Sequence, residues 1–183
     1  PTGLMDLGPA AMERGLVING VSKTYAMTGW RIGYAMGPSR VIKLMTRIQS
    51  HETSNANTLA QRAALAALTM DQAVVAERRA EFDSRRRRMV ELVRQVPGWD
   101  CPDPAGAFYV FPKVSALFGR RSGDVTISDS MALSRELLEK EGVATVAGTA
   151  FGAKEHLRLS YATSMDRIEE GLRRIDRFTR RLV

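Results

Sequence analysis

The chain has 183 residues, of which 44% are hydrophobic and 26% charged, and its formal net charge is +7. This is the composition of a folded protein rather than of a disordered one. The sequence has no apolar run of about 18 residues and does not start like a secretory signal, so we expect a cytoplasmic protein without a membrane partner. The single cysteine, Cys101, excludes an internal disulfide framework and a cysteine zinc cluster, and we expect no bound metal.

Arginine supplies most of the positive charge, which raises the question of a nucleic-acid partner. The arginines of the 77–91 segment alternate with four acidic residues, as is typical of a solvated helix face with ion pairs four residues apart. Nucleic-acid platforms also interleave aromatic residues, whereas this segment contains only Phe82. We therefore expect no nucleic-acid partner.

The first half of the chain predicts two short strands followed by helices. Residues 16–19 form an apolar segment between two glycines, and residues 30–35 form a second one that ends at a Gly-Pro pair. The spacing of the apolar residues then predicts a helix from Pro38, a polar loop over 51–57, a buried helix over 58–68 and a long helix over 71–96.

The second half alternates strands and helices. We expect an aromatic strand over 106–111, a loop over 117–126, a helix over 129–141, strands over 143–146 and 156–162 with a turn over 148–152 between them, and a final helix over 165–182. Gly142 and Ser164 are placed to end the first of these helices and to start the second. In the last strand, Leu157, Leu159 and Tyr161 share one face. These elements predict a mixed α/β fold that divides in the long helix.

Residues 22–34 carry the most informative chemistry. Lys23 follows an apolar strand and has small or uncharged neighbours, so partial desolvation would favour its neutral, nucleophilic amine. Arg31, expected on the next strand, can hold a phosphate through bidentate hydrogen bonds, and the Ser22 hydroxyl can add a donor. Pyridoxal phosphate requires an amine beside an anion-binding group. From these residues alone, ordinary surface charge is the competing interpretation.

Four segments, in the same order along the chain, resemble the class I and II aminotransferases, the aspartate aminotransferase-like branch of the fold-type I pyridoxal-phosphate enzymes. They are residues 22–34 with the cofactor lysine, 50–61 beside the subunit interface, 106–112 on the substrate side and 156–162 with the arginine for the substrate carboxylate. The resemblance implies a partial fold of this type. Residues 1–84 would be the C-terminal part of the large, mainly parallel-sheet domain, and residues 85–183 the small α+β C-terminal domain.

The resemblance also implies roles for single residues. Lys23 would be catalytic, carrying pyridoxal 5'-phosphate on its amine and moving a proton at the substrate α-carbon. Ser22 and Arg31 would bind the cofactor, Arg158 would pair with the substrate α-carboxylate, and Phe108 would line the substrate pocket. The implied activity is that of an aminotransferase, which as a homodimer would move an amino group between an α-amino acid, aspartate or an aromatic one, and a 2-oxo acid.

The chain departs from the family pattern at two points. Gly20 stands where many relatives have a hydroxyl residue that contacts the phosphate. The residues that hold the cofactor ring in the family lie upstream of the lysine, and residues 1–22 contain no match to them. We therefore expect the C-terminal part of an aminotransferase. Two alternatives stay open: a fold-type I lyase or synthase that uses the same residues, and a catalytically inactive fragment that acts only in binding.

Overall fold

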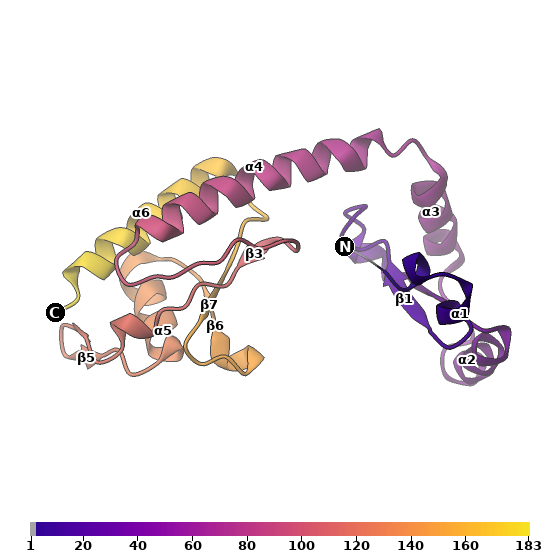
Figure 1. Ribbon diagram of the computed structural model, residues 1–183, viewed down its shortest axis with the longest axis horizontal. Coiled ribbons are helices and arrows are strands. Elements are labelled where there is room, and N and C mark those ends of the chain that lie inside the picture. Colours follow the sequence, from indigo (N-terminus) through magenta and orange to yellow (C-terminus); the bar gives the residue numbers. More distant parts are fainter. Residues whose placement is uncertain (1–2) are drawn as a thin grey trace. The chain divides into compact units, whose positions relative to one another are not determined.

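Helices and short strands alternate along the chain (Figure 1). The computed structural model describes residues 3–183. Contacts within the chain divide it into two compact units, Pro1–Ala76 and Glu77–Val183. The long helix α4 (Ala73–Gln95) begins in the first unit and continues in the second, and it contains the predicted division at residues 84 and 85. Among the described residues, no helix is long and apolar enough to cross a membrane.

The first unit contains an antiparallel strand pair. β1 (Val17–Gly20) and β2 (Gly33–Met36) pair along their whole length, with Gly20 opposite Gly33. The first predicted strand is confirmed within one residue. The second begins three residues later than predicted, because the 3-10 helix η2 (Thr28–Trp30) occupies its expected start. The described part of residues 1–84 contains this antiparallel pair and no parallel strand pair, so its assignment to a large, mainly parallel-sheet domain stays a prediction.

Four helices complete the first unit: η1 (Leu4–Leu7), α1 (Pro9–Met12), α2 (Ser39–Glu52) and α3 (Thr58–Thr69). α2 starts directly after Pro38, as predicted, but it extends through the first two residues of the expected polar loop. α3 buries one small-residue stripe, whereas Leu59 on the same helix is 73% exposed. The prediction of a buried helix is therefore correct for one face only.

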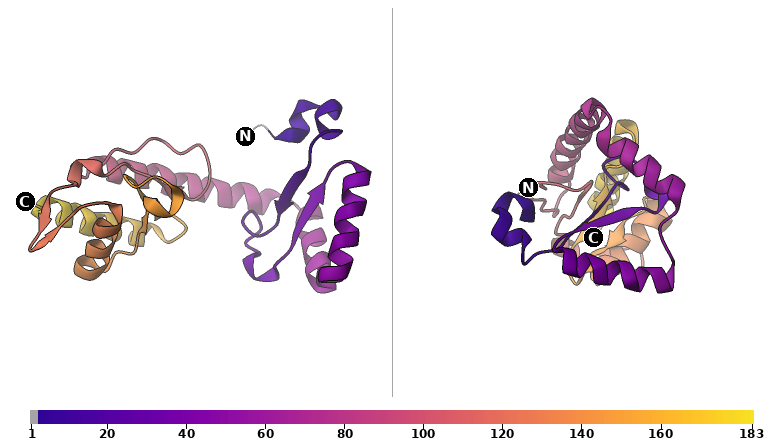
Figure 2. Two further views of the ribbon diagram at one scale, coloured as in Figure 1. Left: turned by 90° about the horizontal axis from the view of Figure 1, so that it is seen from below. Right: turned by 90° about the vertical axis from the view of Figure 1, so that its right-hand side faces the viewer.

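A three-stranded antiparallel sheet forms the second unit together with three helices. The sheet has the order β3-β7-β6, made of β3 (Tyr109–Val110), β7 (Leu157–Ser160) and β6 (Val146–Ala147). The helices are the main part of α4, α5 (Ser130–Glu141) and α6 (Met165–Arg181), and Figures 1 and 2 show α4 and α6 running beside each other. Apolar side chains from all three helices and from the sheet form one hydrophobic core.

The alternation of β7 decides which side chains enter this core. Leu157, Leu159 and Tyr161 are buried, at 0%, 5% and 2% exposure, which confirms that they share a face. Arg158 lies between the two leucines, so its side chain leaves the strand on the opposite face. The fold thus keeps this charge out of the core, while the strand that carries it pairs with β3 on one side and with β6 on the other.

Both ends of α5 lie within one residue of the ends that the sequence predicted. The Asp129 carboxylate accepts hydrogen bonds from the backbone N–H groups of Met131 and Ala132 at the start of α5, and Gly142 ends that helix with a left-handed φ of 64°. The remaining short elements are η3 (Ser115–Leu117), β4 (Arg121–Ser122), β5 (Val125–Thr126) and η4 (Gly148–Phe151). The prediction of a loop over 117–126 was therefore wrong, since this segment contains a small hairpin whose two-residue strands carry no apolar alternation.

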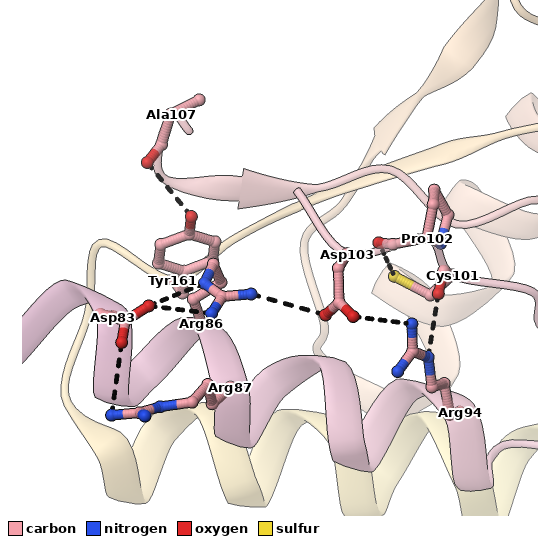
Figure 3. A network of polar contacts seen from close by, with 9 residues as sticks. All are labelled: Asp83, Arg86, Arg87, Arg94, Cys101, Pro102, Asp103, Ala107 and Tyr161. Atoms are coloured by element: carbon pink, nitrogen blue, oxygen red, sulfur yellow. Dashed lines mark hydrogen bonds and ion pairs between the residues drawn. The ribbon is translucent and has the colours of Figure 1, made fainter. Parts of the chain in front are cut away.

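Ion pairs tie the arginine-rich part of α4 to the segment before β3 (Figure 3). Arg86 pairs with Asp83 on the same helix at 2.9 Å and with Asp103 at 3.4 Å, and Arg94 reaches Asp103 at 3.3 Å. Close by, the Tyr161 hydroxyl donates to the backbone oxygen of Ala107 at 3.1 Å. The prediction that these arginines pair with acidic residues is confirmed, and some of the pairs also hold the loop that leads to β3.

Candidate active site

Lys23 lies in a turn at the start of the loop 21–32, which connects β1 to β2. The backbone N–H of Ala26 donates to the Lys23 oxygen at 3.2 Å. On either side of the lysine, Val21 and Met27 are buried, and they pack against the alanine stripe of α3. The hydroxyl of Tyr25 donates to the Gln72 side chain at 2.9 Å. Residues before and after the lysine thus fix the turn to α3 and to the segment that directly follows this helix.

The side chain of Lys23 is exposed. The partial desolvation expected from the sequence is therefore not supplied by the residues that the structure describes. The apolar neighbours of Lys23 in the sequence, Val21 and Met27, turn inward toward α3, while the lysine itself stands on the outer side of the turn.

The sequence predicted that Arg31 lies on a strand, but the structure places it between η2 and β2. Its backbone is left-handed, with φ 52° and ψ 47°, and its Nη1 donates to the backbone oxygen of Thr28 at 3.0 Å. Ala26 also has a positive φ, 56°. Each such conformation costs a residue with a Cβ roughly 1–2 kcal/mol. Strain of this kind concentrates at functional sites, and here both strained positions follow the predicted cofactor lysine in the same loop.

Ser22, Lys23 and Arg31 therefore belong to one loop of the first unit. Ser22 is half-buried, and its backbone oxygen accepts from Met27 N at 3.1 Å, which closes the turn around the lysine. The two other predicted site residues, Phe108 and Arg158, belong to the second unit.

Arg158 stands on the outer face of β7, opposite Val146 of β6. Its guanidinium carbon lies over two aromatic rings, 5.2 Å from the centre of Tyr109 and 4.5 Å from the centre of Phe151. No carboxylate of residues 3–183 forms an ion pair with Arg158. Within residues 3–183, the guanidinium of Arg158 therefore contacts aromatic rings and no carboxylate.

The Phe108 side chain is half-buried and packs against the core of the second unit. Its ring meets the Tyr109 ring edge-on, with centres 5.7 Å apart. The aromatic residue that lies against Arg158 from this strand is thus Tyr109. Strand alternation would have given this result, because Phe108 has the parity of the fully buried Val110. Phe151 lies in a 3-10 turn, where no periodic pattern marks a functional residue.

The family model described as aminotransferase class I and II matches residues 5–175 of this chain. The chain belongs to this family. It is a pyridoxal-phosphate-dependent family of fold type I. A protein of Rhizobium leguminosarum named as a probable aspartate/prephenate aminotransferase is 48% identical over 176 residues, and the aspartate aminotransferase of Geobacillus stearothermophilus is 43% identical over 178. These matches cover 95% and 96% of this chain, and 44% of each relative.

Solved structures give the same result for the fold. The aspartate aminotransferase of Rhizobium meliloti matches with a TM-score of 0.92 and 41% identity over 97% of this chain and 45% of its own. The aromatic aminotransferase of Pyrococcus horikoshii matches with a TM-score of 0.83 and 34% identity over 94% of this chain and 45% of its own. The chain therefore has part of the aspartate aminotransferase fold, and it spans less than half the length of these relatives.

The loop of this aminotransferase-family chain has a donor set that fits a phosphorylated aldehyde. The Lys23 amine is the group that reacts with a carbonyl carbon. The bond to Thr28 uses one of the five N–H donors of the Arg31 guanidinium, which leaves donors for phosphate oxygens. Ser22 adds a hydroxyl. By contrast, no group of three or more His, Cys, Asp or Glu side chains in residues 3–183 is arranged to hold a metal ion.

The Tyr161 hydroxyl, a titratable group of the second unit, binds the segment that leads into β3. Burial raises the pKa of the Tyr161 hydroxyl, so this hydroxyl stays protonated and donates to the Ala107 oxygen. Ala107 has a positive φ of 66° and directly precedes Phe108. A third strained position thus lies next to a predicted site residue, and it accepts a hydrogen bond from Tyr161, which directly follows the strand that carries Arg158.

Proposed function

We propose that this chain is the lysine-bearing, C-terminal part of a pyridoxal-phosphate-dependent aminotransferase, with Lys23 as the catalytic residue. The observation that carries the proposal is the strained loop 21–32, which presents an amine and a guanidinium between two antiparallel strands, in a chain of this family. In this proposal residues 1–84 belong to the large domain, and residues 85–183 form the small domain.

Each site residue has a separate task in the proposed reaction. Lys23 holds the cofactor through its amine and, when the substrate has replaced it there, takes and returns the proton at the substrate α-carbon. Arg31 and Ser22 bind the cofactor phosphate. Arg158 binds the substrate α-carboxylate in the plane of its guanidinium and so orients the α-carbon. When bound, pyridoxal phosphate supplies a ring that stabilises negative charge at that carbon.

The substrate and partner assignments are also part of this proposal. The names of the relatives, aspartate/prephenate and aromatic aminotransferase, support aspartate or an aromatic amino acid as the amino donor and a 2-oxo acid as the acceptor. On α2 and α3, Ile48 and Leu59 are 60% and 73% exposed, which supports a further protein surface over these helices. We propose a homodimer, which sedimentation of the purified chain tests directly.

Cofactor binding is the first test. Pyridoxal phosphate is added to the purified chain, and the near-ultraviolet and visible absorbance is compared between wild type, Lys23→Ala and Lys43→Ala. Lys43 is an exposed lysine of α2 in the same unit and serves as the matched control. The proposal expects a band in wild type and Lys43→Ala that is lost in Lys23→Ala. A band that survives in Lys23→Ala contradicts the role of Lys23, and the lack of any band in wild type contradicts cofactor binding by this chain.

Arg31 has its own test, because pyridoxal lacks the phosphate that this residue would bind. A hydrogen bond to a charged group contributes about 1.5–3 kcal/mol, so Arg31→Ala should weaken pyridoxal phosphate about 10- to 100-fold and leave pyridoxal unchanged. Equal losses for both ligands would mean that Arg31 only shapes the loop.

Product analysis then separates the reaction types. Aspartate and 2-oxoglutarate are supplied to the loaded chain, and an amino-group transfer forms a new 2-oxo acid without ammonia. Ammonia or an elimination product would instead favour the lyase or synthase alternative, since one fold and cofactor serve several reactions. Cofactor binding without any product would refute amino-group transfer by this chain and favour the binding-only alternative.

A further inference from the structure

Arg158 is enclosed by aromatic rings on the outer face of the sheet. Tyr109 comes from β3, the neighbour of β7 on one side, and Phe151 from η4, which directly follows β6 on the other side. Their ring centres lie 5.2 and 4.5 Å from the guanidinium carbon. Cations attract the faces of aromatic rings within about 6 Å of the ring centre, so both contacts are attractive.

The two rings are themselves held by further aromatic side chains. Phe151 meets Phe111 edge-on with centres 5.9 Å apart, and Phe111 stacks on His156 at 4.9 Å. On the other side, Tyr109 meets Phe108 edge-on at 5.7 Å. Edge-on and offset contacts of this kind are favourable beyond the burial of their surface. Each of the two rings that contact the arginine is therefore supported by a further aromatic side chain.

This arrangement matches what a carboxylate requires from an arginine. A guanidinium carries its five N–H donors in its own plane, and ring contacts use none of them in a strong hydrogen bond. No ion pair within residues 3–183 occupies those donors either. An arginine otherwise loses much rotamer freedom when it binds, and a side chain ordered in advance avoids that loss on binding.

We infer that Tyr109 and Phe151 are positioning residues, which hold the Arg158 guanidinium ready for in-plane, bidentate binding of a substrate carboxylate. The inference rests on the proposed function, because Arg158 is the carboxylate-binding residue there. It adds the two residues that determine the orientation of Arg158, and it identifies the ligand class as a planar oxyanion with two oxygens available to one guanidinium.

The resting geometry is measured first, without ligand. Ring currents should shift the Arg158 side-chain resonances of the ¹⁵N-labelled chain upfield from those of the other arginines, with Arg158→Lys providing the assignment. In Phe151→Leu the shift should fall, whereas Phe151→Tyr, which keeps a ring, should retain it. An unshifted Arg158 signal in wild type overturns the inference whatever the variants do.

Binding is then measured by titration with succinate, a simple dicarboxylate. Phe151→Leu should bind succinate about 3- to 10-fold more weakly than wild type, and Phe151→Tyr should bind like wild type. Tyr109→Leu and Tyr109→Phe form a second pair with the same expectation. If wild type binds through Arg158 but both leucine variants bind equally well, the inference is wrong and the proposed function stands. If wild type binds no better than Arg158→Ala, the proposed role of Arg158 fails together with the inference.

Discussion

Glu141 at the end of α5 offers the sharpest prediction for stability. Its side chain is only 3% exposed, and its carboxylate accepts hydrogen bonds from Arg177 and, at 3.1 Å, from Arg181 on α6. The two helices are thus joined through one buried acid. Glu141→Gln keeps the size of the side chain, but it removes the charge and turns an NH₂ group toward a guanidinium that also donates.

The size of the effect follows from these contacts. A hydrogen bond to a charged group contributes about 1.5–3 kcal/mol, and glutamine retains one of the two acceptor oxygens. The side chains of Arg177 and Arg181 are 54% and 62% exposed, so water can satisfy them after the substitution. The loss should therefore stay below the roughly 3–5 kcal/mol of a fully buried broken pair. We expect Glu141→Gln to lower the free energy of unfolding by about 2 kcal/mol.

The assay uses the buried tryptophan of the same unit. Trp99 is 6% exposed and belongs to the core that α4, α5 and α6 share, while Trp30 lies in the first unit. In a Trp30→Phe background, Trp99 fluorescence then follows urea unfolding of the second unit alone. With a slope of roughly 1–3 kcal/mol per M urea, the midpoint should fall by about 1 M.

Asp176→Asn provides the matched control, because Asp176 pairs with an arginine of the same helix, Arg180, which is 60% exposed. Exposed ion pairs contribute about 0–1 kcal/mol, so the control should change the midpoint little. A loss in Glu141→Gln no larger than in Asp176→Asn would refute the reasoning that burial of the carboxylate makes this link strong.

Two further predictions concern other parts of the second unit. In Gly148→Ala the added methyl group would overlap the backbone oxygen of Ala153 and lie 2.5 Å from that of His156. The turn should therefore shift, and the free energy of unfolding measured in urea should fall by about 1–3 kcal/mol. In Gly171→Ala on α6, where a Cβ meets nothing within 4 Å, the free energy of unfolding should instead rise by roughly 0.5–1 kcal/mol. The hydrogen bond from Arg86 holds the pKa of Asp83 below its ordinary value of 3.8, so its contribution to stability is present above that value and is lost as the pH falls through the lowered pKa. Wild type should therefore be more stable than Asp83→Asn at neutral pH, and the two midpoints should converge under strong acid; a constant difference at all pH values would contradict this assignment.

The sequence predicted the fold best at helix ends and in strand alternation, which depend on the local backbone conformation. The helix end at Gly142, the helix start after Ser164 and the alternation around Arg158 were correct, because each depends on one or two residues and their immediate neighbours. The hairpin β4-β5 was missed because its strands are two residues long and carry no apolar alternation. The second strand of the first unit was placed too early because Trp30 and Ile32 read as strand residues, whereas the left-handed backbone at Arg31 prevents pairing before Gly33.

The candidate site depended on more than local signals. The sequence indicated Lys23, Arg31 and Arg158 by their motifs, and the structure places each in a defined local setting. It did not indicate Phe151, since the contact with Arg158 joins a 3-10 turn to a strand, and nothing in the spacing of those residues marks it. It also suggested a desolvated lysine, but the burial of Val21 and Met27 against α3 leaves Lys23 on the outside of its turn.

The central claim, that Lys23 carries pyridoxal phosphate in this chain, is tested most directly by covalent trapping. The purified chain is incubated with pyridoxal phosphate, reduced with borohydride and digested, and the modified peptides are mapped by mass spectrometry. The account predicts one dominant adduct on the peptide that contains Lys23, lost in Lys23→Ala and retained in Lys43→Ala. Adducts spread evenly over the exposed lysines, or unchanged total labelling in Lys23→Ala, would contradict it.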